Sequence, residues 1–150
     1  MTIIAYKDGI MASDSAGWSG ELITNHHAKK IYTAPDGTLV GCVGEVPQID
    51  TFVEWVLAGM KGKPPRSKSI NAIMVKPDGE IWKYTGRGLS LYRHQGRYCV
   101  IGCGWEFALG AMAHGASAPE AVKLTIKFSS FLGGAVQTLR LHPPSRTGKK

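Results

Sequence analysis

The chain has 150 residues, a hydrophobic content of 43% and a formal net charge of +7. This length is typical of one domain, and no stretch approaches the roughly 18 uninterrupted apolar residues of a membrane span. The three cysteines, Cys42, Cys99 and Cys103, lack zinc-ligand spacing, and their odd number argues against a closed disulfide framework, which favours the reducing cytoplasm.

Strand-like runs alternate with turn signals through the first hundred residues. An Asp-Gly turn joins the runs at 2–6 and 10–13, because these residues accept the positive φ angles of tight hairpins. Three further pairs flank turn residues: 29–34 with 38–43, 70–75 with 80–84, and 89–93 with 97–102. Four hairpins predict a substantial antiparallel sheet.

Helical periodicity appears in three segments. Apolar residues gather on one face of 47–60, and Pro47 suits a first helical turn. The segments 105–115 and 118–128 form two further predicted helices, and Ser117 is the expected N-cap of the second.

A last strand is predicted at 135–141. The order of strands, helix, strands, two helices and strand predicts an α+β domain over residues 1–141, with helical layers packed around sheet. Residues 142–150 form a basic C-terminal tail.

Much of the positive charge lies in two segments that are poor in apolar residues, 61–68 (KGKPPRSK) and 145–150 (SRTGKK). Both are expected to be solvated. Clustered Lys and Arg can bind phosphate, but the sequence has no nucleic-acid-binding motif and no interleaving of aromatic with basic residues. We therefore expect no nucleic-acid partner, and a basic nucleic-acid-binding module is the weakest alternative.

Thr2 is ordinarily the first residue of a strand, but its position allows another interpretation. Removal of Met1 would leave Thr2 with a free α-amine beside its own hydroxyl. An α-amine has an unperturbed pKa of about 7.7–8.0, so part of it is neutral near pH 7 and can act as a general base. One residue would then supply both nucleophile and base.

Such a nucleophile needs a nearby cation to depress the local pKa values and an anion to hold the cation. Asp14 follows the second strand, where a carboxylate can face a cleft. Lys29 and Lys30 begin the next strand and point to opposite faces, so one of them can look inward. Alternation does not decide which one, and both could face solvent.

Gly44 ends the strand at 38–43, where the chain turns into a helix. A glycine at a strand end is most often a turn residue. It also lets a backbone N–H approach a substrate closely, and such an N–H can stabilise a tetrahedral oxyanion.

Four blocks together resemble the N-terminal-nucleophile (Ntn) hydrolase superfamily: 2–15 (TIIAYKDGIMASDS), 27–32 (HAKKIY), 38–52 (TLVGCVGEVPQIDTF) and 100–112 (VIGCGWEFALGAM). More narrowly, they resemble proteasome β-subunits and the bacterial proteasome-like peptidase that works with an unfoldase ring. The resemblance spans about residues 2–139.

This resemblance implies roles for particular residues. Thr2 matches the threonine nucleophile, Asp14 the acidic residue after the second strand, and Lys30, rather than Lys29, the lysine that tunes the nucleophile. Gly44 matches the glycine whose amide forms the oxyanion hole. Three neighbours would then lie near the substrate cleft: Val43, Glu45 and Val46.

The resemblance further implies a four-layer αββα sandwich of two antiparallel sheets and assembly into homo-oligomeric rings. Peptides or unfolded proteins would be the substrates, no metal or cofactor would be required, and an unfoldase partner is left open. Two rival interpretations are an Ntn amidase that acts on a small amide, and a catalytically weakened assembly protein with the same fold.

The chain departs from the family pattern at three places. Cys103 stands where relatives usually carry a serine, and Ser129 where many carry an aspartate. Because a thiol is a weak hydrogen-bond donor, we expect weaker support for the α-amine. Pro64 and Pro65 disfavour the second helix that relatives have after 47–60, so one helical layer is expected to be reduced. Cys103 with a histidine base, and a metal at His26 and His27, are minor alternatives.

Overall fold

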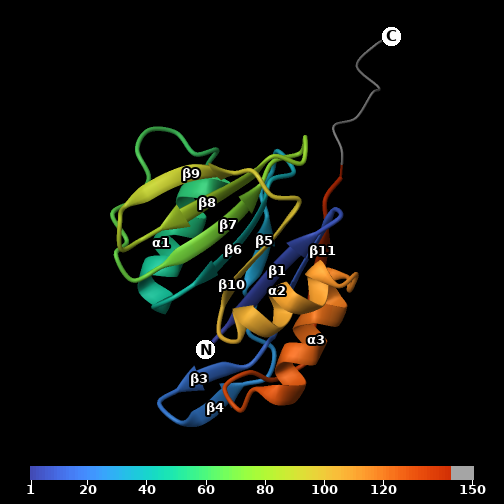
Figure 1. The fold of residues 1–150 in the computed structure, drawn as a ribbon. Helices are drawn as coiled ribbons and strands as arrows, with labels where there is room; N and C mark the ends of the chain where they lie inside the picture. Colours follow the sequence, from blue (N-terminus) through green and yellow to red (C-terminus); the bar gives the residue numbers. More distant parts are fainter. Residues whose placement is uncertain (143–150) are drawn as a thin grey trace.

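The computed structural model describes residues 1–142 (Figure 1). The predicted tail at 142–150 lies, from residue 143 onward, outside the described residues. The strands are β1 Ile3–Lys7, β2 Ile10–Ser13, β3 Gly17–Ser19, β4 Leu22–Asn25, β5 Ile31–Thr33, β6 Leu39–Val43, β7 Asn71–Val75, β8 Ile81–Thr85, β9 Ser90–His94, β10 Tyr98–Gly102 and β11 Gln137–Arg140. The helices are α1 Val46–Leu57, α2 Trp105–Ala113 and α3 Ala118–Phe128.

The strands form antiparallel sheets, so the α+β class is confirmed. One sheet has four strands in the order β10-β1-β2-β11, and another has five in the order β5-β6-β7-β8-β9. The short strands β3 and β4 pair only with each other. β1, which begins directly after residue 2, is thus an inner strand that bonds to β10 on one side and β2 on the other.

Three apolar clusters hold the domain together. The first lies between the two large sheets and includes Ile4, Met11, Ile31, Ile73 and Ile101. The second joins α2 and α3 to the four-stranded sheet, and the third joins α1 to the outer face of the five-stranded sheet. Figure 1 shows α2 and α3 on one side of the molecule and α1 on the other.

Because side chains alternate between the two faces of a strand, β1 contributes residues to two of the apolar clusters. Ile4 and Tyr6 face the other sheet, whereas Ile3 and Ala5 face the helices. All four side chains are buried, with exposed fractions of 0–5%. The residues beside Thr2 therefore have little freedom to move.

The helices begin and end close to the predicted positions. Ser117 caps α3 by accepting a hydrogen bond from the Glu120 N–H at 3.2 Å, as its sequence position predicts. α1 ends at Leu57, three residues before the predicted end. Residues 58–70 then contain no helix, in agreement with the expectation from Pro64 and Pro65.

The fourth predicted hairpin is wrong. β9 pairs with β8 in the five-stranded sheet, whereas β10 pairs with β1 in the other sheet. The turn at 95–97 therefore carries the chain from one sheet to the other. A hairpin of β3 and β4, which the sequence pattern did not predict, is present as well.

No helix within residues 1–142 is both long enough and apolar enough to cross a membrane.

Candidate functional site

The position of Thr2 is fixed by the end of β10. Its carbonyl accepts a hydrogen bond from the Cys103 N–H at 2.8 Å. Gly102 has a φ of +104°, and a Cβ at this position would collide with the Thr2 carbonyl oxygen. A glycine is thus required here for the two strands to approach each other.

Asp14 and Lys30 form an ion pair near the N-terminus. The Lys30 Nζ lies 3.0 Å from both carboxylate oxygens of Asp14. The Asp14 side chain is fully buried, and that of Lys30 is 9% exposed. The backbone N–H groups of Ile3 and Gly133 also donate to the Asp14 carboxylate, at 3.2 and 3.4 Å. The buried anion is therefore well satisfied by donors from three parts of the chain.

The Lys30 ammonium also reaches the chain terminus. It donates a hydrogen bond to the Met1 carbonyl oxygen at 3.0 Å. The Thr2 nitrogen is bonded to the same carbonyl carbon, which brings it within about 5 Å of the Lys30 Nζ by standard peptide geometry. The Met1–Thr2 peptide bond and the lysine thus occupy one small site.

This environment disfavours positive charge on amines. Burial lowers the pKa of the Met1 α-amine, and the nearby Lys30 ammonium lowers it further. Burial also lowers the pKa of Lys30, while the Asp14 carboxylate opposes that shift. The Met1 α-amine is therefore more readily neutral than an exposed amine.

Of the two candidate lysines, only Lys30 reaches Asp14. Lys29 is exposed, and its Nζ lies 4.8 Å from the centroid of the Tyr32 ring. The Tyr32 hydroxyl donates to the Lys29 carbonyl at 3.0 Å. Contact with the buried carboxylate thus distinguishes the two lysines, which strand alternation could not do.

Gly44 connects β6 to α1 in a conformation that other residues rarely adopt. Its φ is +136°, and a Cβ here would collide with the Ser69 carbonyl oxygen. Gly44 and Glu45 are exposed, and the Val46 side chain is 67% exposed, whereas Val43 packs against the cluster between the sheets. The predicted substrate-contacting residues are thus mostly open to solvent.

Cys103 and Ser129 lie side by side although 26 residues separate them. The Cys103 Sγ is 3.7 Å from the Ser129 Oγ, and the Ser129 Oγ accepts from the Phe131 N–H at 3.3 Å. The Cys103 N–H also bonds the Thr2 carbonyl, so Cys103 adjoins residue 2, and Ser129 contacts the Cys103 side chain. The Cys103 thiol thus contacts the hydroxyl of Ser129 and not the imidazole of a histidine.

Sequence reasoning missed the contribution of the loop after α3. The Gly133 carbonyl accepts from the Ser15 and Ala16 N–H groups at 3.0 Å, in addition to the bond that its own N–H donates to Asp14. Gly134 has a φ of +74°, and a Cβ here would collide with the Ser15 Oγ. The adjacent glycines at 133 and 134 were the available signal, since paired glycines often mark close backbone approach.

No group of three or more His, Cys, Asp or Glu residues that could hold a metal ion occurs within the part of the chain that the structure describes. His26 and His27 are both exposed in the segment before β5.

The sequence matches no protein-family model, and no curated protein sequence matches it. Solved structures do match. Eukaryotic HslV from Trypanosoma brucei is 16% identical with a TM-score of 0.71, and the match covers 93% of this chain and 98% of that chain. BPH from Thiobacillus denitrificans is 18% identical with a TM-score of 0.68, covering 95% and 99%. BPH in complex with epoxomicin gives 0.67 at the same identity and coverage. At such low identities the likeness is one of fold.

Proposed function

Because the chain has the Ntn-hydrolase fold of the proteasome β type, we propose that it is a threonine peptidase that hydrolyses peptide bonds once Met1 has been removed. Its substrates are peptides or unfolded proteins, and its compartment is the cytoplasm. The reaction uses no metal and no cofactor.

In this mechanism the Thr2 hydroxyl attacks the substrate carbonyl, and the free Thr2 α-amine takes the hydroxyl proton. The Lys30 ammonium supplies positive potential, and Asp14 holds Lys30 in place. The Gly44 N–H donates to the oxyanion of the tetrahedral intermediate. The amine returns the proton to the departing amino group, and water then hydrolyses the ester, which restores Thr2.

The observation that carries this proposal is the contact of Lys30 with both Asp14 and the Met1 carbonyl, each at 3.0 Å. The lysine neutralises the buried Asp14 carboxylate and is at the same time directed at the residue 1–2 peptide bond. It is well placed to act on whatever amine begins the processed chain.

We further propose that the layered arrangement is the αββα sandwich, with the helical layer over the five-stranded sheet reduced to α1. The protein then assembles into a homo-oligomeric ring. Support comes from the apolar side chains that α2 and α3 leave exposed, such as Phe107 at 55% and Phe128 at 63%. An unfoldase partner is not part of the proposal.

The test compares wild type with Thr2→Ala, Thr2→Ser and the control Thr33→Ala, which alters an exposed threonine on β5. Intact mass is expected to show wild type beginning at Thr2. Wild type, Thr2→Ser and Thr33→Ala should hydrolyse fluorogenic peptides, and Thr2→Ala should not. Epoxomicin should add covalently to the wild-type protein, at the peptide that contains Thr2. It should not add to Thr2→Ala.

Peptide hydrolysis that survives in a folded Thr2→Ala protein would refute the proposal. A specific observation favours a catalytically weakened assembly protein as the second candidate: the Cys103–Ser129 contact, at 3.7 Å, is a weak substitute for a hydroxyl network. For that candidate, wild type would retain Met1 and would not react with epoxomicin. Hydrolysis of small amides but not of peptides, still dependent on Thr2, would indicate an amidase.

A further inference from the structure

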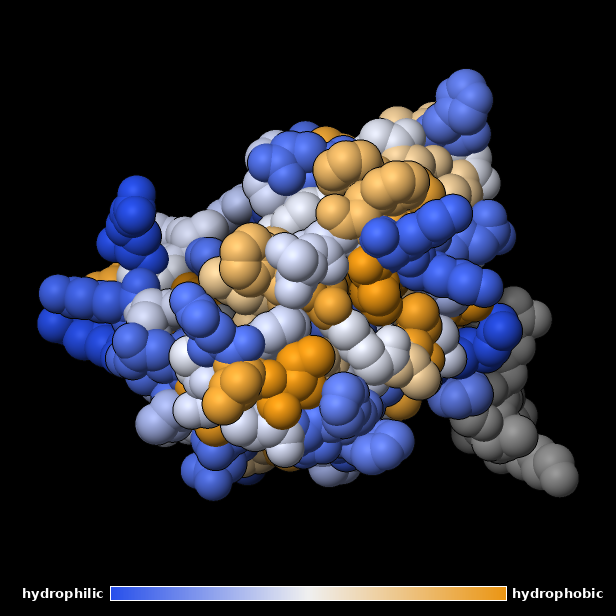
Figure 2. Space-filling model, turned by 90° about the horizontal axis from the view of Figure 1, so that it is seen from below, coloured by the Kyte–Doolittle hydropathy of each residue, from blue (hydrophilic) through white to orange (hydrophobic). Residues whose placement is uncertain are grey.

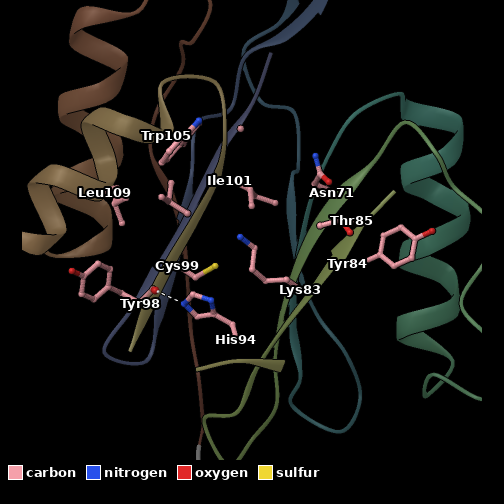
Figure 3. Close-up of a pocket in the computed structure, with 12 residues that line it drawn as sticks. Asn71, Lys83, Tyr84, Thr85, His94, Tyr98, Cys99, Ile101, Trp105 and Leu109 are labelled. Atoms are coloured by element: carbon pink, nitrogen blue, oxygen red, sulfur yellow. Dashed lines mark hydrogen bonds between the residues drawn. The ribbon is translucent and has the colours of Figure 1, made fainter. Parts of the chain in front are cut away.

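A cavity of about 420 Å³ opens between the edges of the two large sheets (Figure 3). Its volume is within the range of small-molecule sites, about 300–1,000 Å³. β7 and β8 form one wall, and β10 with the first turns of α2 forms the other. The residues that matter for its chemistry are Asn71, Lys83, His94, Ile101, Trp105 and Leu109.

The β10 wall presents backbone groups that no neighbouring strand of the described residues pairs. β10 is an edge strand whose only partner in the sheet is β1. The Cys103 N–H bonds the Thr2 carbonyl, so the register makes Ile101 and Cys99 the residues bonded to β1, while Val100 and Tyr98 direct their N–H and C=O groups away from it. The Val100 N–H points away from β1 and lies beside the Cys99 thiol, where it opposes the rise in pKa that burial causes.

His94 closes one end of the cavity. Its Nε2 lies 3.0 Å from the Tyr98 carbonyl oxygen, a bond that crosses from β9 to β10 (Figure 3). This contact confirms that the Tyr98 backbone faces the cavity, and it satisfies one of the carbonyl groups at the open edge.

Lys83 brings a positive charge into the same space. Strand alternation places it on the face of β8 that looks toward the other sheet, and Figure 3 shows its side chain extending from β8 toward β10. No carboxylate pairs with Lys83 anywhere in residues 1–142, and no acidic residue is among those that line the cavity. Burial raises the pKa of the facing Cys99 thiol, and the Lys83 charge opposes that shift.

The remaining walls are apolar. Ile101 belongs to the cluster between the sheets, and α2 adds Trp105, 45% exposed, and Leu109, 37% exposed. An ammonium group therefore shares the cavity with large hydrophobic side chains.

We propose that this cavity binds a small carboxylate with an apolar tail. The carboxylate pairs with Lys83, and the tail lies against Ile101, Trp105 and Leu109. Two sources carry this chemistry: a free fatty acid and the carboxyl end of a short peptide. The site does not include Thr2, Asp14 or Lys30, so it stands whether or not the chain is a peptidase.

The test uses octanoate and N-acetyl-leucyl-leucine as probes, each beside its neutral amide. Binding to wild type is measured by calorimetry, and the site is mapped by NMR shifts of the Val100 amide and the Trp105 indole. Lys83→Met removes the charge with little change in shape, and Lys68→Met is the control, since Lys68 is exposed in the segment before β7. Thr2→Ala is included to separate this site from the proposed active site.

At least one acid is expected to bind wild type, Lys68→Met and Thr2→Ala alike, to shift the two mapped signals, and to bind Lys83→Met about tenfold more weakly. The amides should bind all four proteins equally weakly. The acid that binds more tightly identifies the source. The proposal is overturned if neither acid binds wild type at millimolar concentration, or if each amide binds as tightly as its acid. The comparison of each acid with its amide uses the wild-type protein, so it tests the proposal even if Lys83→Met fails to fold.

Discussion

Lys30 illustrates how far single residues could be assigned from sequence. The residue types at positions 2, 14 and 30 pointed to one chemistry before any contact was known. Alternation failed to choose between Lys29 and Lys30 because both precede β5, which begins only at Ile31, and alternation applies inside a strand. The buried carboxylate of Asp14 distinguishes them, and that carboxylate is remote in sequence.

Lys30→Met should destabilise the protein by about 3–5 kcal/mol, because it leaves the fully buried Asp14 carboxylate without its cation. Urea unfolding followed by circular dichroism measures the change. Hydrolysis of fluorogenic peptides should be lost as well.

The double variant Asp14→Asn with Lys30→Met should recover part of that stability, because no buried charge remains, yet it should stay inactive. A double variant no more stable than Lys30→Met would contradict the view that the isolated charge causes the loss.

The three thiols should differ in reactivity. Burial raises the pKa of the Cys42 and Cys99 thiols, whose residues are 2% and 3% exposed, so little thiolate forms and reagents cannot reach it. Cys103 is partly exposed. Iodoacetamide at pH 8 should therefore add once to the native protein and three times in urea, as read by intact mass. Rapid native labelling that survives in Cys103→Ser would contradict this expectation.

At the scale of elements, local pattern predicted most strands and all three helices but misjudged how some strands pair. The turn before β10 has the signals of a hairpin, yet β10 bonds to β1 because that pairing buries Cys99 and Ile101 between the sheets. A period-2 pattern indicates which face of a strand is apolar, but it does not indicate which sheet the strand joins. β3 and β4 were missed because β4 is exposed throughout and shows no alternation in burial.

The junction of β6 and α1 should tolerate no side chain at residue 44. Gly44→Ala adds both left-handed strain and a collision with the Ser69 carbonyl. Gly59→Ala is the matched control, because Gly59 has a φ of +98° and open space around its Cβ position. The control should lose about 1–2 kcal/mol for strain alone. The free energy of unfolding of Gly44→Ala should fall by about 1–3 kcal/mol more than that of the control, because the added methyl group also overpacks the junction.

Thermal and urea unfolding of the two variants measure this difference. Equal losses would indicate that the α1 junction shifts freely, and the rigid placement of the Gly44 amide would then be wrong.

For the whole molecule, the most prominent surface feature is the apolar face of α2 and α3. Phe107 and Phe128 stack with ring centroids 5.9 Å apart, although both are more than half exposed. Leu124 and Phe131 extend this face. Figure 2, a view from below, shows hydrophobic patches among hydrophilic residues on the surface. Clusters of this kind commonly mark protein interfaces.

Phe128→Glu should reduce assembly, because a charge would enter an interface that covers α3. Sedimentation velocity measures the change in mass distribution. Leu22→Glu is the control: Leu22 is 72% exposed on β4, outside the α2–α3 face. A wild type that is monomeric at all concentrations, or an assembly that Phe128→Glu leaves intact, would contradict the use of this face.

The central place of β1 in its sheet sets the order of events during folding. Ile3 pairs with Gly102, and the Asp14 carboxylate accepts from the Gly133 N–H. Contacts so distant in sequence form late. The arrangement around residue 2 is therefore complete only once the segments that contain Gly102 and Gly133 have folded against β1 and Asp14.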